Sequence, residues 1–269
     1  MMTIQPSIFA IYGNPVAHSK SPLMHNYVFK HLNYPAIYTR VHLLDGDQLK
    51  EDFFNRKLDG ANVTVPHKEA AFNACDEVRG FAQTVGVVNT LINENGRLIG
   101  YNTDADGFLY ALESFGLIKN ILVLGAGGTA KALVQKFINE GFKVTVVNRS
   151  EKRLESFKQL NCQTATWDSF KVGSFDLIVN TSSAGLEDDL YPINQTILAE
   201  LFDNSKYVAD VIYGKKTPFL QLAQEKGLQT IDGQAMLIGQ GVLANELFTH
   251  KRLNKDAILS AMKASFLLS

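Results

Sequence analysis

A glycine-rich segment between an apolar run and a helix-like stretch places the strongest constraint on how this chain can fold. Residues 121–124 are apolar, Gly125-Ala126-Gly127-Gly128-Thr129-Ala130 follows, and residues 129–139 have the pattern of an amphipathic helix. Gly125 permits a tight turn, Gly127 lets a phosphate approach the backbone, and small Ala130 lets the helix pack on a sheet. This context predicts a dinucleotide site with the helix N-terminus facing the pyrophosphate. The alternative is a tight turn without a ligand.

The following strand favours one dinucleotide over the other. Residues 143–147 are again apolar and end at Asn148-Arg149-Ser150. NAD sites usually carry an acidic residue about 20 residues beyond the glycine turn, and that acid is missing here. Arg149 can stack on adenine and contact a 2′-phosphate, with Arg153 one helical turn further on. We therefore expect NADP, although these arginines could instead solvate a helix start.

Strands and helices alternate along the chain, which is typical of an α/β fold. The predicted strands cover residues 7–12, 36–43, 61–65, 87–92, 97–101, 121–124, 143–147, 176–180, 207–212 and 229–231. The predicted helices begin at Ser21-Pro22 and at Pro66 and cover residues 48–58, 129–139, 234–249 and 255–268. Asn95-Gly96 indicates a tight hairpin between the fourth and fifth strands. The length of 269 residues exceeds the usual size of one hydrophobic core and predicts two domains.

Composition excludes several classes of protein. The 26 basic and 27 acidic residues lack the basic excess that nucleic-acid binding requires. No apolar run approaches the roughly 20 residues of a membrane span, and residues 1–10 do not resemble a secretory signal. Cys75 and Cys162 are far apart, which fits reduced thiols, and neither they nor the histidines have metal-site spacing. We expect a cytoplasmic protein that acts on a small molecule without a metal, as a monomer or homodimer.

Two serines stand immediately before the first predicted helix, in Asn14-Pro15-Val16-Ala17-His18-Ser19-Lys20-Ser21-Pro22. Their hydroxyl groups and the free amides at the helix start would suit a carboxylate. Ser21 before Pro22 is equally well explained as an ordinary helix cap. The serines alone therefore leave the choice between a ligand site and a cap open.

Further segments accompany these serines and the glycine turn. They are Asn62-Val63-Thr64-Val65-Pro66-His67-Lys68, Gly86-Val87-Val88-Asn89-Thr90 and Gly100-Tyr101-Asn102-Thr103-Asp104-Ala105-Asp106-Gly107. In order and spacing, from about Ile11 to Phe248, the chain resembles the shikimate dehydrogenase family. The resemblance implies an α/β protein of two domains. Residues 1–104 and 236–269 would form a substrate domain completed by C-terminal helices, and residues 105–235 an inserted Rossmann-like NADP-binding domain.

The resemblance also implies site residues in both domains. Those for substrate would be Ser19, Ser21, Thr64, Lys68, Asn89, Asp104, Tyr213 and Gln240, with the two serines on the carboxylate. Those for the cofactor would be Gly125, Ala126, Gly127, Gly128, Thr129, Ala130, Asn148, Arg149, Ser150, Arg153, Thr181, Ser182, Ile212, Gly233 and Met236. Leu186 stands where the family commonly has methionine, and Gly241 replaces a usual alanine. Whether Tyr213 assists the chemistry or only shapes the pocket stays open.

Lys68 and Asp104 would form the catalytic pair. Hydride delivery to a ketone places negative charge on oxygen, which requires a nearby cation and then a proton, and a lysine ammonium supplies both. Asp104 would orient Lys68 and keep a partly buried cation paired. The alternatives are a solvated lysine in a helix first turn and a helix cap formed by Thr103 or Asp104.

These expectations combine into one function. We expect an oxidoreductase that reduces 3-dehydroshikimate to shikimate with NADPH, reversibly, in the shikimate pathway of aromatic amino-acid biosynthesis. The nearest alternative is an NAD-dependent quinate/shikimate dehydrogenase, because quinate differs mainly around the ring carbon that bears the carboxylate. A noncatalytic ligand sensor on the same fold is a further alternative, against which the presence of both Lys68 and Asp104 argues.

Overall fold

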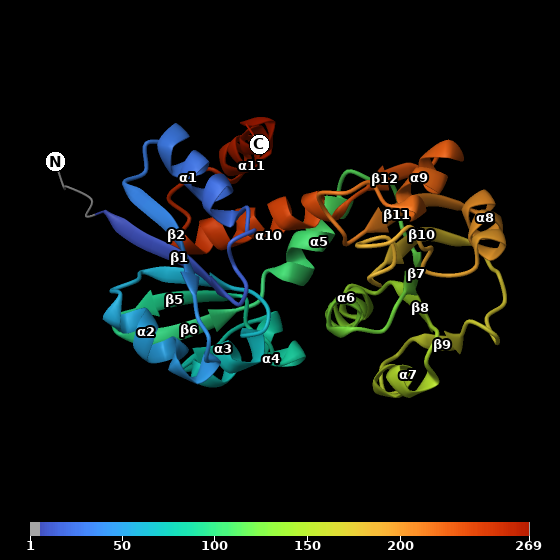
Figure 1. The fold of residues 1–269 in the computed structure, drawn as a ribbon, viewed down its shortest axis with the longest axis horizontal. Helices are drawn as coiled ribbons and strands as arrows, with labels where there is room; N and C mark the ends of the chain where they lie inside the picture. The colour runs from blue at the N-terminus through green and yellow to red at the C-terminus, as the bar shows by residue number, and fades with distance from the viewer. Residues whose placement is uncertain (1–5, 269) are drawn as a thin grey trace. The chain divides into compact units, whose positions relative to one another are not determined.

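The chain divides into two compact units, seen here in a computed structural model that describes residues 6–268. Unit 1 runs up to Gly107 and resumes at Ile238, whereas unit 2 comprises Phe108–Leu237. Figure 1 shows a sheet flanked by helices in each unit. The expectation for residues 1–10 lies partly outside the described residues. None of the helices over residues 6–268 combines the length and hydropathy that a membrane span requires.

Unit 1 is built on a six-stranded mixed sheet of order β2-β1-β3-β5-β6-β4. Its strands are β1 (Ser7–Gly13), β2 (Ala36–His42), β3 (Gly60–Val63), β4 (Glu77–Val78), β5 (Thr90–Glu94) and β6 (Arg97–Tyr101). Its helices are α1 (Ser21–His31), α2 (Leu49–Asn55), α3 (Lys68–Ala74), α4 (Phe81–Val85) and α11 (Lys255–Ser265). Helices α5 (Asp104–Leu112) and α10 (Gly233–Phe248) carry the chain from one unit into the other.

The strand directions bring four chain segments to one edge of this sheet. β1 pairs in parallel with β3, so their carboxyl ends lie together. β5 is antiparallel to β3, with Asn62 opposite Thr90, so the start of β5 lies at the same edge. β6 is antiparallel to β5, with Thr90 opposite Tyr101, so the end of β6 joins them. The loops that follow β1, β3 and β6 and the one that precedes β5 therefore share one edge.

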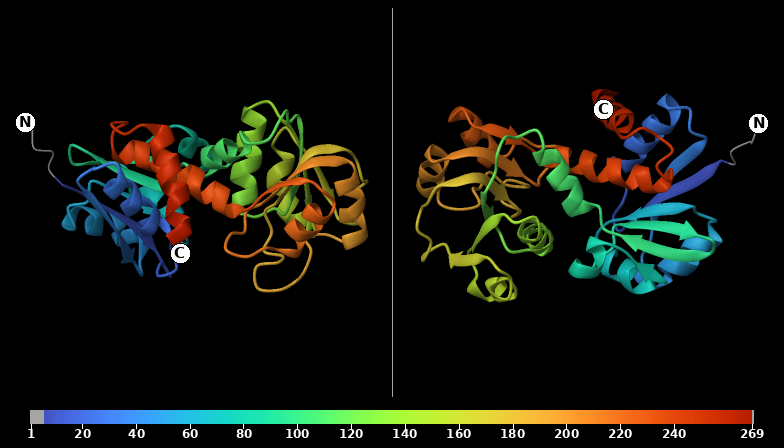
Figure 2. Two further views of the ribbon diagram at one scale, coloured as in Figure 1. Left: turned by 90° about the horizontal axis from the view of Figure 1, so that it is seen from above. Right: turned by 180° about the vertical axis from the view of Figure 1, so that it is seen from behind.

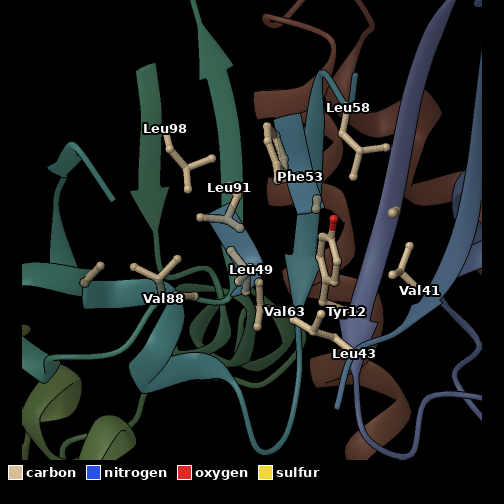
Figure 3. Packing of buried hydrophobic residues seen from close by; sticks show 14 residues of the cluster. Tyr12, Val41, Leu43, Leu49, Phe53, Leu58, Val63, Val88, Leu91 and Leu98 are labelled. Atoms are coloured by element: carbon tan, nitrogen blue, oxygen red, sulfur yellow. The ribbon is translucent and has the colours of Figure 1, made fainter. Parts of the chain in front are cut away.

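A hydrophobic cluster between this sheet and α2 anchors that arrangement. Figure 3 shows Leu49 and Phe53 of α2 beside side chains of β1, β3, β5 and β6, among them Tyr12 and Leu91. Leu49 and Phe53 are fully buried. Each such side chain contributes about 1.5–3 kcal/mol when it leaves water. The Tyr12 hydroxyl reaches the rim of the cluster and donates to Asp52 Oδ2 at 2.8 Å.

The C-terminal helices return to unit 1, as the sequence predicts. α11 packs beside α1 (Figures 1 and 2). Phe248 at the end of α10 stacks on Phe9 of β1, with ring centroids 4.6 Å apart. Gly241 fits between neighbours, because a Cβ there would lie 2.7 Å from Met24 Cε and 3.1 Å from Met262 Sδ. The glycine that departs from the family pattern is therefore matched by two bulky methionines.

Unit 2 is a doubly wound parallel sheet of order β12-β11-β10-β7-β8-β9. Its strands are β7 (Asn120–Leu124), β8 (Lys143–Asn148), β9 (Gln163–Thr166), β10 (Phe175–Asn180), β11 (Ser205–Asp210) and β12 (Gln229–Ile231). Its own helices are α6 (Gly128–Asn139), α7 (Glu151–Lys158), α8 (Gln195–Asp203) and α9 (Pro218–Glu225). Figure 1 shows α6 and α7 on one face and α8 and α9 on the other. The strand order reverses between β7 and β10, the place where such sheets bind ligands.

Several element boundaries differ from the sequence predictions. α3 begins at Lys68 rather than at Pro66, because a turn in which His67 N donates to Thr64 O comes first. The N-cap of α1 is Lys20, so Ser21 is the first helical residue and not the predicted cap. β5 begins at Thr90, which leaves Asn89 just outside the strand in which we expected it.

His25 of α1 makes the stability of unit 1 dependent on acid. Its ring is fully buried and stacks on Tyr38 at a centroid distance of 4.4 Å. Its Nδ1 lies 3.0 Å from Asn245 Nδ2. Burial lowers the pKa of His25 from 6.5 to about 3. Between pH 6.5 and about pH 3, His25 is therefore protonated in the unfolded chain but neutral in the folded protein.

We predict that His25 costs the protein about 2 kcal/mol of unfolding free energy between pH 7 and pH 5, from about 1.36 kcal/mol per pKa unit. The loss of stability begins near pH 6.5, the pKa of His25 in the unfolded chain. It continues as the pH falls, because the pKa of His25 in the folded protein is lower, at about 3. Urea unfolding of wild type and His25→Phe at both pH values measures it. A stability difference between the two proteins that stays constant with pH would contradict the prediction.

Candidate active site

An ion pair lies at the edge of the unit 1 sheet where the four segments meet. Lys68 Nζ donates to Asp104 Oδ2 at 2.6 Å, joining the first residue of α3 to the first residue of α5. The two side chains are 30% and 21% exposed, so the pair is partly shielded but open to a ligand. The carboxylate oxygens of Asp104 accept from other side chains, Oδ2 from Lys68 and Oδ1 from Asn89, and its backbone N donates to Asn102 Oδ1. Lys68 is not the solvated lysine of the alternative interpretation.

Asn89 fixes the carboxylate of this pair. Its Nδ2 donates to Asp104 Oδ1 at 2.9 Å and to Thr103 Oγ1 at 3.0 Å, and its Oδ1 accepts from Thr103 N at 2.8 Å. Lys68 is tied to the same segment, because its carbonyl accepts from Val88 N at 3.0 Å. The Asp104 carboxylate therefore has one oxygen on the lysine and the other on a buried amide.

A second layer of buried polar groups continues from Asn89 and was missed by sequence reasoning. Asn62 Nδ2 donates to Asn89 O and to Thr90 Oγ1, and Asn62 Oδ1 accepts from Tyr38 Oη at 2.7 Å. The signal available in the sequence was Asn62 in the predicted strand at residues 61–65, since a buried amide requires partners. These groups connect the ion pair to the segment that precedes α1.

Ser19 and Ser21 lie at that end of the network, and both are buried. Ser19 Oγ accepts from Ser21 N at 3.3 Å. Burial raises the pKa of Tyr38 well above its ordinary value, although a hydrogen bond with Ser21 lowers it. Arg40 Nη2 donates to Ser19 O at 2.6 Å, which brings a guanidinium to the serine loop. The two serines are thus held by different side chains of β2, Ser19 by Arg40 and Ser21 by Tyr38.

Gln240, a residue of unit 1, lies at a close crossing of α5 and α10. A Cβ on Gly107 of α5 would lie 2.2 Å from Gln240 N, and one on Gly239 would lie 2.2 Å from Gly107 O. Only glycine permits this approach. The crossing puts Gln240 next to the helix that begins with Asp104, whereas Thr64 follows β3, and Tyr12 O accepts from Thr64 N at 2.8 Å.

The glycine-rich turn of unit 2 has the geometry that a pyrophosphate needs. Gly125 has φ +112, and a Cβ there would lie 2.8 Å from Thr181 Oγ1. At Gly127 and Gly128, no heavy atom among the described residues comes within 4 Å of where a Cβ would lie. Within residues 6–268 no side chain caps α6, so its first amides face this open space. The residues present therefore fit a dinucleotide, with Thr129 and Ala130 in the first turn of the helix.

The segment after β8 carries the predicted adenine-side residues. Asn148 Nδ2 donates to Ser150 O at 2.9 Å and so fixes the turn around Arg149. Arg149 is exposed, and its Cζ lies 5.9 Å from the centre of the Trp167 ring. Arg153 is exposed on α7. Trp167 was not among the residues singled out from the sequence.

Asp210 organises the loops after β10 and β11, where further cofactor candidates lie. It accepts from Asn180 Nδ2, Ile212 N and Thr217 Oγ1, the last at 2.7 Å. Asn180 Oδ1 in turn accepts from Ser182, both N and Oγ. Burial raises the pKa of Asp210, against the lowering effect of these hydrogen bonds. The sequence offered Asp210 only as part of a strand-end segment.

The remaining predicted residues occupy the same side of unit 2. Gly233 N donates to Ile212 O at 2.9 Å, and a Cβ on Gly233 would meet Val211 O at 2.2 Å. Met236 follows in the first turn of α10 and is partly buried. The side chains of Tyr213 and Leu186 are 38% and 49% exposed, respectively. Both of these exposed side chains leave apolar surface for a ligand.

Comparison with known proteins extends these observations over the whole chain. Residues 11–91 match the family model of the shikimate dehydrogenase substrate binding domain, and residues 111–184 match that of shikimate / quinate 5-dehydrogenase. A shikimate dehydrogenase (NADP(+)) of Helicobacter hepaticus is 44% identical, with 96% of this chain and 97% of that protein covered.

Solved structures are also similar to this protein over nearly its whole length. Shikimate 5-dehydrogenase of Thermus thermophilus, in complex with NADP(H) and shikimate, is 36% identical at a TM-score of 0.84, covering 96% of this chain and 99% of its own. A 5-ketofructose reductase of Gluconobacter reaches 0.83 at 26% identity, with 97% and 99% covered. The fold is thus shared by enzymes whose names state different substrates.

The strand order of unit 2 and its glycine turn are those of a dinucleotide-binding fold, and the relatives with this fold are NADP-dependent oxidoreductases. With family models over more than half of its length and a relative 44% identical, the chain belongs to the shikimate dehydrogenase family. The predicted fold class, cofactor and family are confirmed.

The helix crossing at Gly107 yields a test. We predict that Gly107→Ala lowers the unfolding free energy by about 1–3 kcal/mol, because the added methyl overlaps the backbone of α10. Gly173→Ala is the matched control, since its nearest neighbour would be Phe175 Cε2 at 3.6 Å, and we expect a change within about 0.5 kcal/mol. Urea unfolding midpoints measure both. Equal midpoints for Gly107→Ala and wild type would contradict the close approach.

Proposed function

We propose that this protein reduces 3-dehydroshikimate to shikimate with NADPH, reversibly, in aromatic amino-acid biosynthesis. Residues 1–104 and 236–269 would serve as the substrate domain and residues 105–235 as the NADP domain. The protein would work in the cytoplasm, as a monomer or homodimer. The observation that carries the proposal is the Lys68–Asp104 pair, 2.6 Å long and partly open, at the edge where the substrate-side motifs converge.

Lys68 would act on the carbonyl oxygen. When bound, NADPH supplies the hydride. The oxygen that gains negative charge is stabilised by the Lys68 ammonium, which then donates a proton from Nζ. Asp104 keeps that ammonium in place and accepts a hydrogen bond from a ring hydroxyl. Because Asn89 already occupies Asp104 Oδ1, the carboxylate stays oriented while its partner exchanges the proton.

The rest of unit 1 would recognise the substrate. Ser19 and Ser21 bind the carboxylate, helped by the free amides at the start of α1. Thr64, Asn89 and Gln240 address ring oxygens from three different segments. This division suits a small ring with a carboxylate at one end and the reacting carbon at the other. Tyr213 is proposed as a further substrate contact.

The dinucleotide would be held entirely by unit 2. Residues 125–130 receive the pyrophosphate at the start of α6, which has open space above two glycines. Asn148, Arg149, Ser150 and Arg153 take the adenosine end, and the arginines offer charge to a 2′-phosphate. The proposed nicotinamide-side residues are Thr181, Ser182, Ile212, Gly233 and Met236.

Removing the proton donor should abolish most turnover. We predict that Lys68→Ala lowers kcat by about 10²–10⁴-fold, the usual range for a lost general acid, without a comparable loss of folded protein. Lys30→Ala, an exposed lysine of α1, is the control and should behave like wild type. The assay follows absorbance of reduced nicotinamide with shikimate and NADP. Near-normal turnover by Lys68→Ala would remove the mechanism.

Cofactor and substrate preference are tested in one matrix of initial rates. We expect reduction of NADP by shikimate to be fastest, because two arginines follow β8 and no acidic residue stands at Asn148-Arg149-Ser150 to bind a 2′-hydroxyl. In further assays NAD replaces NADP, and quinate replaces shikimate. A higher kcat/KM with NAD or with quinate would favour the quinate/shikimate alternative. No reaction with any combination, from folded protein, would favour a ligand sensor.

A further inference from the structure

We propose that Trp167 is a positioning residue that holds Arg149 ready for the adenosine 2′-phosphate of NADP. The inference deepens the proposed function and rests on it. No motif marked Trp167 in the sequence, and it lies outside the glycine turn and the arginine segment. What points to it is its place in the sheet of unit 2.

Strand register makes Trp167 and Arg149 neighbours. β8 and β9 are parallel, and Asn148 pairs with Thr166 at their carboxyl ends. The residues that immediately follow the two strands are therefore Arg149 after β8 and Trp167 after β9. Their side chains meet, with Arg149 Cζ 5.9 Å from the ring centre. β7, which leads into the glycine turn, is the other neighbour of β8, so the pair lies beside the dinucleotide edge.

Trp167 is the anchored member of the pair. It is partly buried and packs against the core cluster of unit 2 that contains Val147, Ile178 and Leu198. Arg149 is exposed, and among residues 6–268 no hydrogen bond or ion pair holds its guanidinium. The ring face is therefore what limits the motion of an otherwise mobile cation. A guanidinium within about 6 Å of a tryptophan ring is attracted by the negative face of the ring.

This arrangement leaves Arg149 free to do two things at once. The contact with Trp167 is made by the guanidinium carbon Cζ, 5.9 Å from the ring centre, and does not occupy the N–H groups. Those N–H groups can bind a phosphate, and the planar guanidinium can also stack on adenine. An arginine whose guanidinium is already positioned loses less side-chain entropy on binding a phosphate than an unrestrained arginine does. Trp167 should thus favour NADP over NAD without touching the phosphate.

The experiment uses the full-length protein and two replacements of the ring. Trp167→Phe keeps an aromatic face, whereas Trp167→Met keeps apolar volume without one. Dissociation constants for NADP, NAD and adenosine 2′,5′-bisphosphate are measured by calorimetry, each also in an Arg149→Gln background. Urea unfolding reports whether each variant is folded. Trp167 is the only tryptophan of the chain, so wild-type fluorescence during titration with NADP reports on this site alone.

We expect Trp167→Met to lower the preference for NADP over NAD by about two- to fivefold, the range for an exposed cation–π contact. Trp167→Phe should stay within about twofold of wild type. In the Arg149→Gln background the loss caused by Trp167→Met should vanish, because the two residues act as one unit. NADP and the bisphosphate should both change the wild-type emission.

Two results would overturn the inference. Equal weakening of NADP and NAD by Trp167→Met would mean that the ring only supports the fold. Additive losses in the double variant would mean that Trp167 and Arg149 act independently. Wild-type protein that binds the bisphosphate through this pair but does not reduce NADP with shikimate would instead sink the proposed function and leave the inference standing.

Discussion

The hydrogen bonds of Asn89 are the interactions on which the candidate site depends. One buried amide joins Thr103 to Asp104 Oδ1, and its neighbour Val88 is joined to Lys68 through the backbone. A partly buried carboxylate beside a lysine is stable only when both partners are held and their remaining groups are satisfied. Asn89 supplies that condition from the loop between α4 and β5. The proposed proton donor therefore keeps its orientation because the edge of a mixed sheet places three segments around one amide.

Unit 2 is suited to a different task, the binding of a long ligand that carries several phosphate charges. Its sheet reverses direction of winding between β7 and β10, which opens space above the strand ends, and glycines keep that space clear. Asp210 then fixes the two loops on the far side of the reversal. In both units a buried polar side chain next to a strand end fixes the loop residues around it. Asn89 does so in unit 1 and Asp210 in unit 2.

Sequence reasoning found the parts that are encoded locally. The glycine turn, the hairpin at Asn95-Gly96 and the alternation of strands and helices are set by short-range patterns, and the structure confirms them. The helix starts were less well predicted. A helix cap at Ser21 was one of two interpretations, but Ser19 Oγ accepts the Ser21 amide, because the chain makes an additional turn before the helix. Both serines are buried, which local preference alone did not indicate.

The sequence by itself determined the residue types, the order of the strands and helices, and the family to which the motifs belong. Only the tertiary structure decided which side chains meet. Lys68 and Asp104 are 36 residues apart, and Arg149 and Trp167 follow different strands, so neither pair follows from spacing. Contact between such residues is fixed by strand register and by close helix crossings such as that at Gly107. Those features are set by packing over the whole unit, which no local pattern contains.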